Sequence, residues 1–501
     1  MAKVLALLAS PQDWPASILI LGITTFVILL FRFATRPAWP LKAPKSLQGW
    51  PVLGSPGFFG HRLSFLQKGF SKSSSGQFSF FYGPYPIVAL SGSAGRKTFY
   101  TSRGLDMNEG FAALFSAAPT VDHLYDGEGT LGNHLVSLFK RFLQKGRLES
   151  NLPIMVRDCM TSFHDLDTSV PVDPFDSVYA LIYQLTVRHL GSVDIANDPK
   201  LLRETLGIFG ALDDSSALEV MFPRLPVPSR LSKIWAGARL HRIFCKIMQD
   251  RRRTGRTEED PMQLMMDDGE KDVITSAFIM GGIFAGLLNT GVISAWILLF
   301  LSQNSLWYRK VQDEVSAAIA KHRYSETEPG PDVLGRLKME DWETDFPMID
   351  YCLRETIRLV MPGSAIRKNV GKDIEILGSG EIIPRNTYAV YPIADVHLDP
   401  EVYSEPHKWD PSRYFADRAE DKKVSHAYVG WGSGMHPCLG MKFAKIEVAM
   451  CIALFVAFFD FKLVDKDGNT ENAQLPTLNH GNFSATRQAG QAFLQCERRT
   501  L

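Results

Sequence analysis

The sequence lacks the features of a nucleic-acid-binding, zinc-binding or nucleotide-binding protein. Its 54 lysines and arginines are balanced by 54 aspartates and glutamates, so it has no basic excess for a phosphate backbone. We therefore expect no nucleic acid partner. Its six cysteines include no C-x-x-C pair and are typical of reduced intracellular thiols. No G-x-G-x-x-G motif follows a predicted strand, and Gly92–Thr98 lacks the spacing of a phosphate loop. The chain shows no nucleotide site of its own.

Charge is missing from the segment Trp14–Phe31, which is 18 residues long. A membrane-spanning helix needs about 17–25 apolar residues, so this length is at the lower limit. Four basic residues follow between positions 32 and 45, a bias that places the rest of the chain in the cytosol. We predict that residues 1–36 form a single-pass anchor in a lipid membrane. The alternative is a cleaved signal peptide, but no small-residue cleavage site follows.

A second segment, Val273–Leu301, contains 29 residues without one charge. By hydropathy alone it would be another membrane span. Four glycines lie within it, at positions 281, 282, 286 and 291, and Asn289 and Thr290 lie at mid-length. Glycines weaken a helix but let a large group approach its backbone. A helix that is apolar all round can also cross the centre of a large core. We predict a buried core helix.

The expected fold class is mainly α with a small β part, organised as a single catalytic domain over residues 57–501. Prolines recur between residues 37 and 56, where they fix φ and remove backbone donors, so this segment predicts a stiff hinge. The other predicted elements are strands within 78–90 and 367–390 and helices within 131–303, 348–360 and 441–459.

The clearest candidate for chemistry is Cys438, which directly precedes the last predicted helix. Two glycines and a proline between positions 432 and 437 predict a tight loop before it, and Gly440 keeps the following position free of bulk. At a helix N-terminus, the dipole and free N–H groups lower a thiol's pKa and can donate to a metal-bound sulfur. A thiolate held in this way suits the axial position of haem iron. A buried, inert cysteine in a glycine-rich turn is the alternative.

This loop resembles the haem-binding loop of the cytochromes P450, whose pattern is F-x-x-G-x-[RH]-x-C-x-G. Gly434, His436, Cys438 and Gly440 match the pattern, and Trp431 replaces the usual phenylalanine with another aromatic ring. The resemblance implies that the chain binds haem b, with Cys438 as the metal ligand. It also implies that His436 hydrogen-bonds a haem propionate.

Two further segments resemble landmarks of the same family. Glu355 and Arg358 match E-x-x-R and share a helix face, and Arg413 lies in a segment like the one that supplies a second arginine. The resemblance implies that these three form a buried charge network behind the haem loop. Arg367 matches an arginine that binds a propionate. The likeness extends from about residue 37 to the C-terminus and includes His397–Pro400.

One landmark is altered. The long helix of the family carries A-G-x-[DE]-T-[TS], in which an acid and an alcohol supply protons for dioxygen activation. This chain has Ala285 and Gly286, but Leu288 replaces the acid and Asn289 the alcohol, with Thr290 next. The change resembles the sterol and prostanoid branch of the family. Asn289 and Thr290 are the candidate catalytic residues, Thr290 only if the helix is locally unwound. The family's tryptophan-containing propionate site is also missing, around residues 138–142.

The resemblance implies a fungal-type microsomal monooxygenase that inserts one oxygen atom of dioxygen into a lipophilic terpenoid, steroid or alkaloid-like metabolite. We expect electrons from an NADPH–cytochrome P450 reductase, with cytochrome b5 as a second candidate donor. The expected substrate walls are Gly281–Thr290, Phe115, Gly363–Ile366 and Asn479–Phe483. Two alternatives remain: an isomerase or dehydratase that acts on a peroxide without a reductase, and a non-catalytic haem-binding membrane protein. The sequence does not name the substrate, the position oxidised or the pathway.

Overall fold

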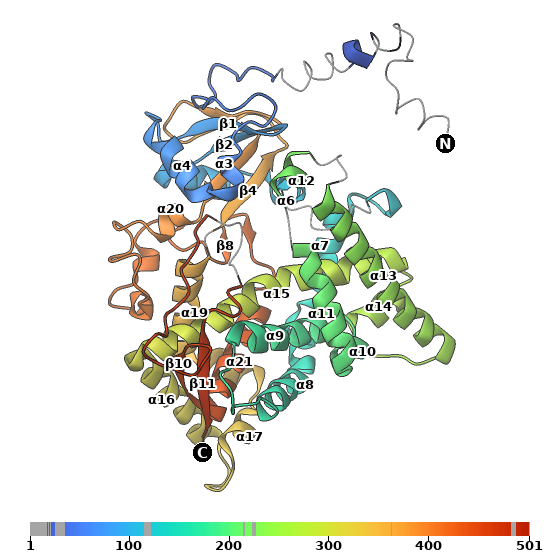
Figure 1. Ribbon diagram of the computed structural model, residues 1–501, viewed down its shortest axis with the longest axis vertical. Coiled ribbons are helices and arrows are strands. Elements are labelled where there is room, and N and C mark those ends of the chain that lie inside the picture. The colour runs from blue at the N-terminus through green and yellow to red at the C-terminus, as the bar shows by residue number, and fades with distance from the viewer. Residues whose placement is uncertain are drawn as a thin grey trace.

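The computed structural model describes residues 36–114, 122–213, 216–222, 227–361, 363–481 and 487–499, together with positions 18, 20 and 22–25. Figure 1 shows a mainly helical body with a small sheet on the side of the N-terminus. The predicted anchor lies largely outside the described residues, so residues 1–36 as an anchor stay a prediction. So do the other two predicted segments, 37–56 and 57–501.

Helices occur along most of the described chain, from the residues near the sheet to the C-terminal third, and one long helix lies at the centre. Their bounds are α3 Gly57–Gly60, α4 Arg62–Ser71, α5 Gly92–Thr101, α6 Met107–Leu114, α7 Leu131–Phe142, α8 Lys145–His164, α9 Pro174–Leu190, α10 Val193–Asn197, α11 Pro199–Asp213, α12 Ala217–Met221, α13 Pro228–Thr254, α14 Pro261–Asp267, α15 Asp272–Gln303, α16 Ser305–His322, α17 Gly330–Leu334, α18 Met339–Thr344, α19 Pro347–Val360, α20 Ala394–His397 and α21 Met441–Phe458. Short 3₁₀ turns cover Asp122–Leu124, Pro411–Tyr414 and Glu420–Lys422.

The main sheet has five strands in the order β1-β2-β7-β4-β3. Its strands are β1 Phe78–Tyr82, β2 Tyr85–Ala89, β3 Leu105–Asp106, β4 Ser364–Asn369 and β7 Tyr388–Pro392. The predicted hairpin within 78–90 is confirmed: β1 and β2 pair antiparallel around Gly83, whose φ of 53° suits glycine. β7 joins β2 in parallel and β4 antiparallel, so the strands predicted within 367–390 complete this sheet.

The proline-rich segment packs along the first strand of that sheet. The Leu47 amide donates to the Ser79 carbonyl at 2.8 Å, and the Ser79 hydroxyl donates to the Pro44 carbonyl at 2.6 Å. The Trp39 ring lies 5.1 Å from the Phe81 ring. These contacts hold the predicted hinge against the catalytic body.

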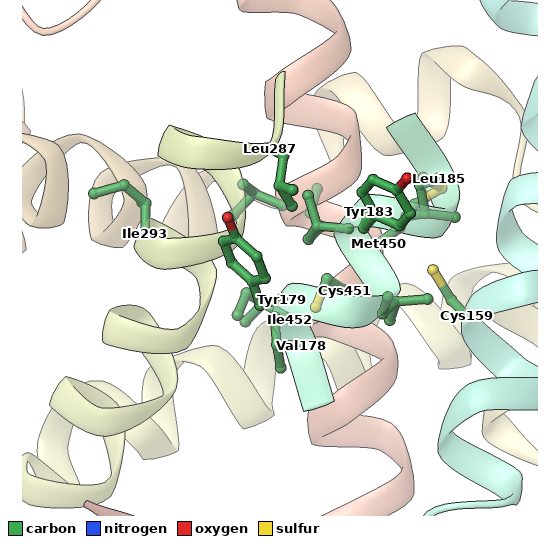
Figure 2. Packing of buried hydrophobic residues seen from close by; sticks show 14 of the residues in the cluster. Cys159, Val178, Tyr179, Tyr183, Leu185, Leu287, Ile293, Met450, Cys451 and Ile452 are labelled. Atoms are coloured by element: carbon green, nitrogen blue, oxygen red, sulfur yellow. The ribbon is translucent and has the colours of Figure 1, made fainter. Parts of the chain in front are cut away.

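Helix α15 crosses the centre of the molecule. It is the one helix among the described residues that is long and apolar enough to span a membrane, and 78% of its most apolar stretch is buried. Figure 2 shows Leu287 of α15, Tyr179 of α9 and Met450 of α21 in one continuous core. Because its apolar surface is buried by neighbouring helices, the core-helix prediction is confirmed.

Three two-stranded pairings complete the described structure. β5 Ile374–Glu375 pairs with β6 Ile382–Ile383, and β8 Gly432–Ser433 with β9 His436–Pro437. The predicted last helix ends at Phe458, one residue early, because Phe459 starts β10 Phe459–Val464, which pairs with β11 Phe493–Arg498. We did not predict this pairing from the sequence, because the two strands lie about 30 residues apart and meet only in the folded protein.

Candidate active site

The loop before Cys438 is a tight hairpin whose shape requires glycine. Gly432 and Gly434 have φ values of 69° and 60°, in the left-handed region. A Cβ on Gly434 would lie 2.1 Å from the Tyr100 carbonyl oxygen, so no side chain fits there. The Met435 amide donates to that same carbonyl at 3.1 Å. The loop is therefore pinned to the end of α5, and Cys438 follows it immediately before α21.

The Cys438 thiol is solvent-accessible, although protein surrounds most of it. Its backbone amide donates to the Trp431 carbonyl at 2.7 Å. Burial raises the pKa of the thiol, while the backbone N–H groups of Gly440 and Met441, which donate to the sulfur, oppose that rise. We expected the N–H groups to leave the pKa lowered; in the protein, desolvation outweighs them. A Cβ on Gly440 would meet no other atom within 4 Å, so the space at Gly440, whose amide donates to the sulfur, is open.

A buried positive group lies next to this loop. Arg367 on β4 is 3% exposed and donates from Nη1 to the Phe99 carbonyl at 2.5 Å. Burial lowers its pKa to about 10. Among the described residues, no acidic side chain forms an ion pair with it. The nearby His436 ring contacts the Leu105 carbonyl at 3.3 Å through Nε2, and burial together with Arg367 lowers its pKa. Such an unneutralised buried cation suits a carboxylate ligand.

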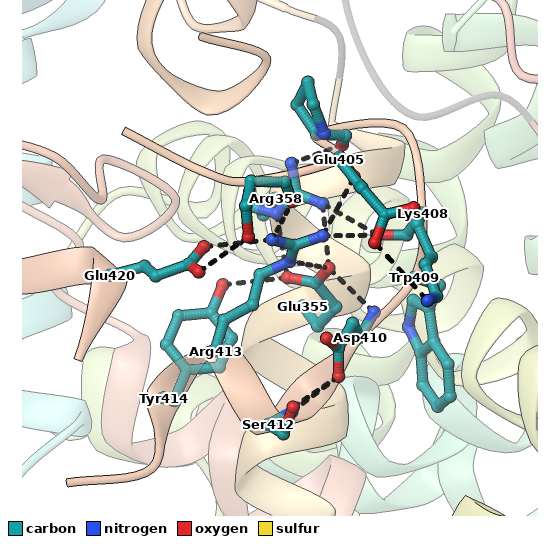
Figure 3. Close-up of polar contacts among 12 residues, drawn as sticks. Glu355, Arg358, Glu405, Lys408, Trp409, Asp410, Ser412, Arg413, Tyr414 and Glu420 are labelled. Carbon is teal, nitrogen blue, oxygen red and sulfur yellow. Dashed lines mark hydrogen bonds and ion pairs between the residues drawn. The ribbon is translucent and has the colours of Figure 1, made fainter. Parts of the chain in front are cut away.

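The three residues of the predicted charge network lie together (Figure 3). Both Glu355 and Arg358 are fully buried on α19, and Nε and Nη2 of Arg358 each donate to the carboxylate at 2.8 Å. Arg413 donates to Glu355 at 3.0 Å and to Glu420 at 2.9 Å. The hydroxyl of Tyr414 also donates to Glu355, at 3.2 Å. Buried charges are stable only when paired and hydrogen-bonded, and this cluster satisfies both conditions.

The cluster is connected to the cysteine loop through His397 on α20. Arg358 donates to the His397 carbonyl at 2.6 Å, and the His397 ring nitrogen Nε2 accepts from the Val429 amide at 3.0 Å. Burial, followed by Arg358, lowers the pKa of His397 to about 3, so the ring is neutral and can accept. The sequence motif marked His397 as a landmark, but its contact with Val429 and the role of Glu420 depend on tertiary packing.

The altered segment of α15 presents its residues to two different surroundings. Ala285 and Asn289 are exposed, four positions apart and therefore on one face, in a stretch that is otherwise mostly buried. Leu288 and Thr290 are buried. The helix is continuous from Asp272 to Gln303, so the local unwinding required to bring Thr290 onto the Asn289 face is absent. The structure brings Asn289, and not Thr290, to the open face.

The glycines of α15 serve helix packing. A Cβ on Gly286 would lie 2.8 Å from the Thr186 side chain, and one on Gly291 would lie 2.7 Å from the Tyr179 ring, both on α9. We expected these glycines to let a large group approach the helix backbone. Gly286 and Gly291 instead let α9 approach α15 closely, because a methyl group at either position would collide with it.

The remaining sequence-based candidates are less informative. In the region that replaces the family's tryptophan site, Lys140 is exposed and Arg141 pairs with Asp268. Of the expected substrate walls, Phe115 and Phe483 lie outside the described residues. The His480 ring contacts the Leu359 carbonyl at 2.9 Å and so is held against the end of α19.

Comparison with known proteins agrees with this geometry. A family model described as cytochrome P450 matches residues 44–481. The cytochrome P450 monooxygenase AacuE of Aspergillus aculeatus is 31% identical over 489 residues, covering 93% of this chain and 97% of that protein. The cytochrome P450 monooxygenase dmxR5 of Cryptosporiopsis sp. is 28% identical and covers 91% of each chain. The sterol 14-demethylase of Arabidopsis thaliana is 24% identical, covering 88% of this chain and 91% of that protein.

The fold agrees as well. The solved structure of retinoic acid bound cyanobacterial CYP120A1 aligns with a TM-score of 0.72 at 19% identity, covering 92% of this chain and all of that one. The helical body, its small sheet and the cysteine loop define a haem-thiolate oxidoreductase. The chain belongs to the cytochrome P450 family and is an enzyme of the cytochrome P450 monooxygenase class. Its cofactor is haem with a cysteine thiolate ligand.

The residues present fit that cofactor. The accessible sulfur of Cys438 lies beside open space at Gly440, and two backbone N–H groups donate to it. The buried guanidinium of Arg367 has a donor face without a carboxylate partner, as a propionate site requires. The site therefore offers a sulfur ligand and an anion-binding cation around one loop.

Proposed function

We propose that Cys438 would bind the haem iron through its thiolate and that Arg367 and His436 would bind the haem propionates. The accessible cysteine and the unneutralised arginine near the same pinned loop support this assignment. Three further residues shape the loop. The Trp431 carbonyl accepts a hydrogen bond from the Cys438 amide, Gly434 allows close contact with α5, and Gly440 leaves open space next to the cysteine. Haem with a thiolate ligand supplies the electron density that favours O–O cleavage.

The proposed reaction is insertion of one oxygen atom of dioxygen into a lipophilic small molecule, such as a terpenoid, steroid or alkaloid-like metabolite of secondary metabolism. The observation that carries the proposal is the open face of α15, where Ala285 and Asn289 are exposed within an otherwise buried helix. The neighbouring residues of α15 are apolar, so this face suits an apolar substrate. The fungal relatives named as monooxygenases support the same reaction class.

Asn289 is the proposed polar contact on that face. Its amide can donate and accept hydrogen bonds and so hold a water or a substrate hydroxyl, but it has no proton of its own to give as a general acid. Leu288 cannot carry a proton, and Thr290 is buried away from the exposed face. We expect Asn289→Ala to consume NADPH and release hydrogen peroxide with little product, and Thr290→Ala to do so less severely.

The proposed electron donor is an NADPH–cytochrome P450 reductase, with cytochrome b5 as a second donor. The proposed location is the endoplasmic reticulum membrane, with the catalytic domain in the cytosol and residues 1–36 as the anchor. Deletion of residues 1–36 should release at least part of the protein from membranes and leave haem binding intact, because α15 is a core helix. Retention of the truncated protein after alkaline carbonate extraction would contradict the single anchor.

Two experiments test the proposal directly. Reduced protein under carbon monoxide should show the absorption of thiolate-ligated haem, and Cys438→Ala and Cys438→His should both lose it. A thiolate signature in Cys438→Ala would refute the ligand assignment.

The second experiment identifies the substrate by mass spectrometry, as the lipophilic metabolite that accumulates when the protein is removed from its host. Product should then require reductase and NADPH. Conversion of a peroxide substrate without reductase would instead establish the isomerase or dehydratase alternative, which the altered Leu288 and Asn289 favour.

A further inference from the structure

Three core helices bring a carboxyl group, a hydroxyl group and a bare stretch of backbone together. Glu447 on α21 is fully buried, and its Oε1 accepts a hydrogen bond from the Thr186 hydroxyl on α9 at 3.3 Å. Thr186 lies against Gly286 on α15, where an added Cβ would be 3.3 Å from the Thr186 oxygen. The Thr186 hydroxyl therefore lies between the Glu447 carboxyl group and Gly286 of the altered motif.

The polar row continues one turn along α9. His189 is fully buried, and its ring stacks on the Phe443 ring at 4.5 Å, one turn before Glu447 on α21. Its Nδ1 lies 3.0 Å from the Asn151 side-chain amide on α8, which is partly exposed. Since Thr186 and His189 are one turn apart, as are Phe443 and Glu447, the two polar residues of α9 both face α21. The row leads from the surface toward α15.

In the middle of this row, Oε2 of Glu447 has no hydrogen-bond partner among the described residues. An unpaired buried polar atom is costly, and buried polar sites of this kind are commonly completed by ordered water. Burial raises the pKa of Glu447 well above its usual range and lowers that of His189 to about 3. Burial therefore favours the protonated form of the Glu447 carboxyl group, and the His189 ring is uncharged at neutral pH.

We propose that Glu447 and Thr186 relay protons to the open face of α15, in place of the acid that Leu288 replaces. Gly286 and Asn289 are three positions apart on α15 and hence neighbours on its surface, and Asn289 is exposed. For the transfer, the Thr186 hydroxyl turns from Glu447 toward Gly286, and the carboxyl group turns so that its O–H donates to the Thr186 oxygen. The Glu447 proton then joins that oxygen, while the original hydroxyl proton of Thr186 passes to a water taken up beside Gly286 and Asn289. The carboxylate is then reprotonated from solvent through the His189 side.

This inference rests on the proposed monooxygenation, whose balance defines what the relay must deliver. Insertion of one oxygen atom into a C–H bond takes two electrons from NADPH through the reductase and two protons, and the second oxygen atom leaves as water. Without an acid at Leu288 or a hydroxyl at position 289, the described part of α15 offers no proton donor on its exposed face. Two protons per turnover must therefore come from beside the helix.

The first test needs no substrate. Infrared spectra of the purified holoenzyme should contain the carbonyl stretch of a buried, protonated carboxyl group that is absent in Glu447→Gln. The band should shift in Thr186→Val, which loses the hydrogen bond, and return in Thr186→Ser, which keeps the hydroxyl. Identical spectra for the wild type and Glu447→Gln would overturn the proposal, because Glu447 would then hold no proton to give.

The second test measures product formed per NADPH, with reductase and the metabolite that accumulates in the absence of the protein. Glu447→Gln and Thr186→Val should lower this ratio about tenfold, with a matching rise in hydrogen peroxide. That is less than the 10²–10⁴ of a full general acid, because water partly replaces the relay. Thr186→Ser should restore coupling, and Thr275→Val, a matched change at a buried threonine on α15, should leave it unchanged.

The outcomes separate the relay from a structural role and from the reaction itself. Haem content and the carbon monoxide spectrum should be normal in every variant, because none of these residues contacts the cysteine loop. Wild-type coupling in both Glu447→Gln and Thr186→Val would overturn the relay and leave the monooxygenation standing. Absence of any reductase-dependent product from the wild-type enzyme would overturn the monooxygenation and the relay together, whatever the infrared band shows.

Discussion

Two buried charge clusters in this protein use the same electrostatics for different ends. The first centres on the acid Glu355, which binds Arg358 and Arg413 beside α19. The second centres on the base Arg251 of α13, whose fully buried guanidinium binds Asp194 at 2.5 Å and Asp260 at 2.5 Å. In Figure 1 the first lies in the region of α19 and α20, and the second around α10, α13 and α14.

The partners outside each cluster explain the difference. Arg358 donates to the carbonyls of His397 and Pro406, so the first cluster holds a long loop whose far end carries Cys438. In the second, Asp260 accepts from the Val193 and Gln263 amides and so caps the start of α10 and of α14. Buried ion pairs thus hold the loop that carries Cys438 in one region, and they cap the starts of two helices in the other.

The largest expected effect is at the first cluster. Glu355→Ala leaves two buried arginines without a shared carboxylate, a loss on the order of 3–5 kcal/mol out of a typical stability of roughly 5–15 kcal/mol. Little folded, haem-loaded protein should be recovered, as measured by haem content per chain and by thermal unfolding. Glu405→Ala, at an exposed carboxylate in the same loop, is the matched control and should be neutral. Full haem content in soluble Glu355→Ala would remove the distinction between the two regions.

Arg251→Ala should destabilise the fold by a similar amount, on the order of 3–5 kcal/mol, because Asp194 and Asp260 are left unpaired. The consequence for the cofactor should differ. The fraction that remains folded should keep its full haem content and an unchanged carbon monoxide spectrum, since this cluster has no contact with the cysteine loop. Selective loss of haem from the folded fraction would show that the comparison between the clusters is mistaken.

The pH dependence of the unfolding free energy tests the contribution of His397, which contacts the first cluster. Burial lowers the pKa of His397 from 6.5 to about 3, so below pH 6.5 the unfolded chain binds a proton that the folded protein does not. The stability that this neutral histidine contributes is present above pH 6.5 and is lost as the pH falls toward 3. The slope is up to about 1.4 kcal/mol per pH unit. His397→Gln should flatten the loss in urea unfolding between pH 6.5 and 5, whereas exposed His164→Gln should not.

The smallest effect is expected at the neighbour of Arg251. Arg252 pairs with Asp272 at 2.6 Å, but 47% of the Arg252 side chain is exposed. An exposed pair of this kind contributes about 0–1 kcal/mol and is screened by salt. Arg252→Ala should therefore change the unfolding midpoint little, and less still at high ionic strength. A loss as large as that of Arg251→Ala would mean that burial does not control the strength of these pairs.

Much of the fold and of the site could be predicted because the signals are local. The hairpin around Gly83, the long core helix and the helix after Cys438 follow from turn chemistry and apolar periodicity. The cysteine loop is likewise specified within ten residues, since its two left-handed glycines and its cysteine are adjacent in sequence. The E-x-x-R pair was predictable for the same reason.

The rest could not be predicted because it joins residues that are far apart. The pairing of β10 with β11, the contact from His397 to Val429 and the Arg251 cluster depend on which surfaces meet. Periodicity also could not show that Gly286 faces Thr186 while Asn289 is exposed, because both lie in one uncharged helix. A chain encodes its turns, helices and adjacent motifs through short-range sterics and hydrogen bonding. The environment of each side chain depends on packing between segments that are far apart in the sequence. That packing decides the protonation state of the side chain and the residues that it contacts.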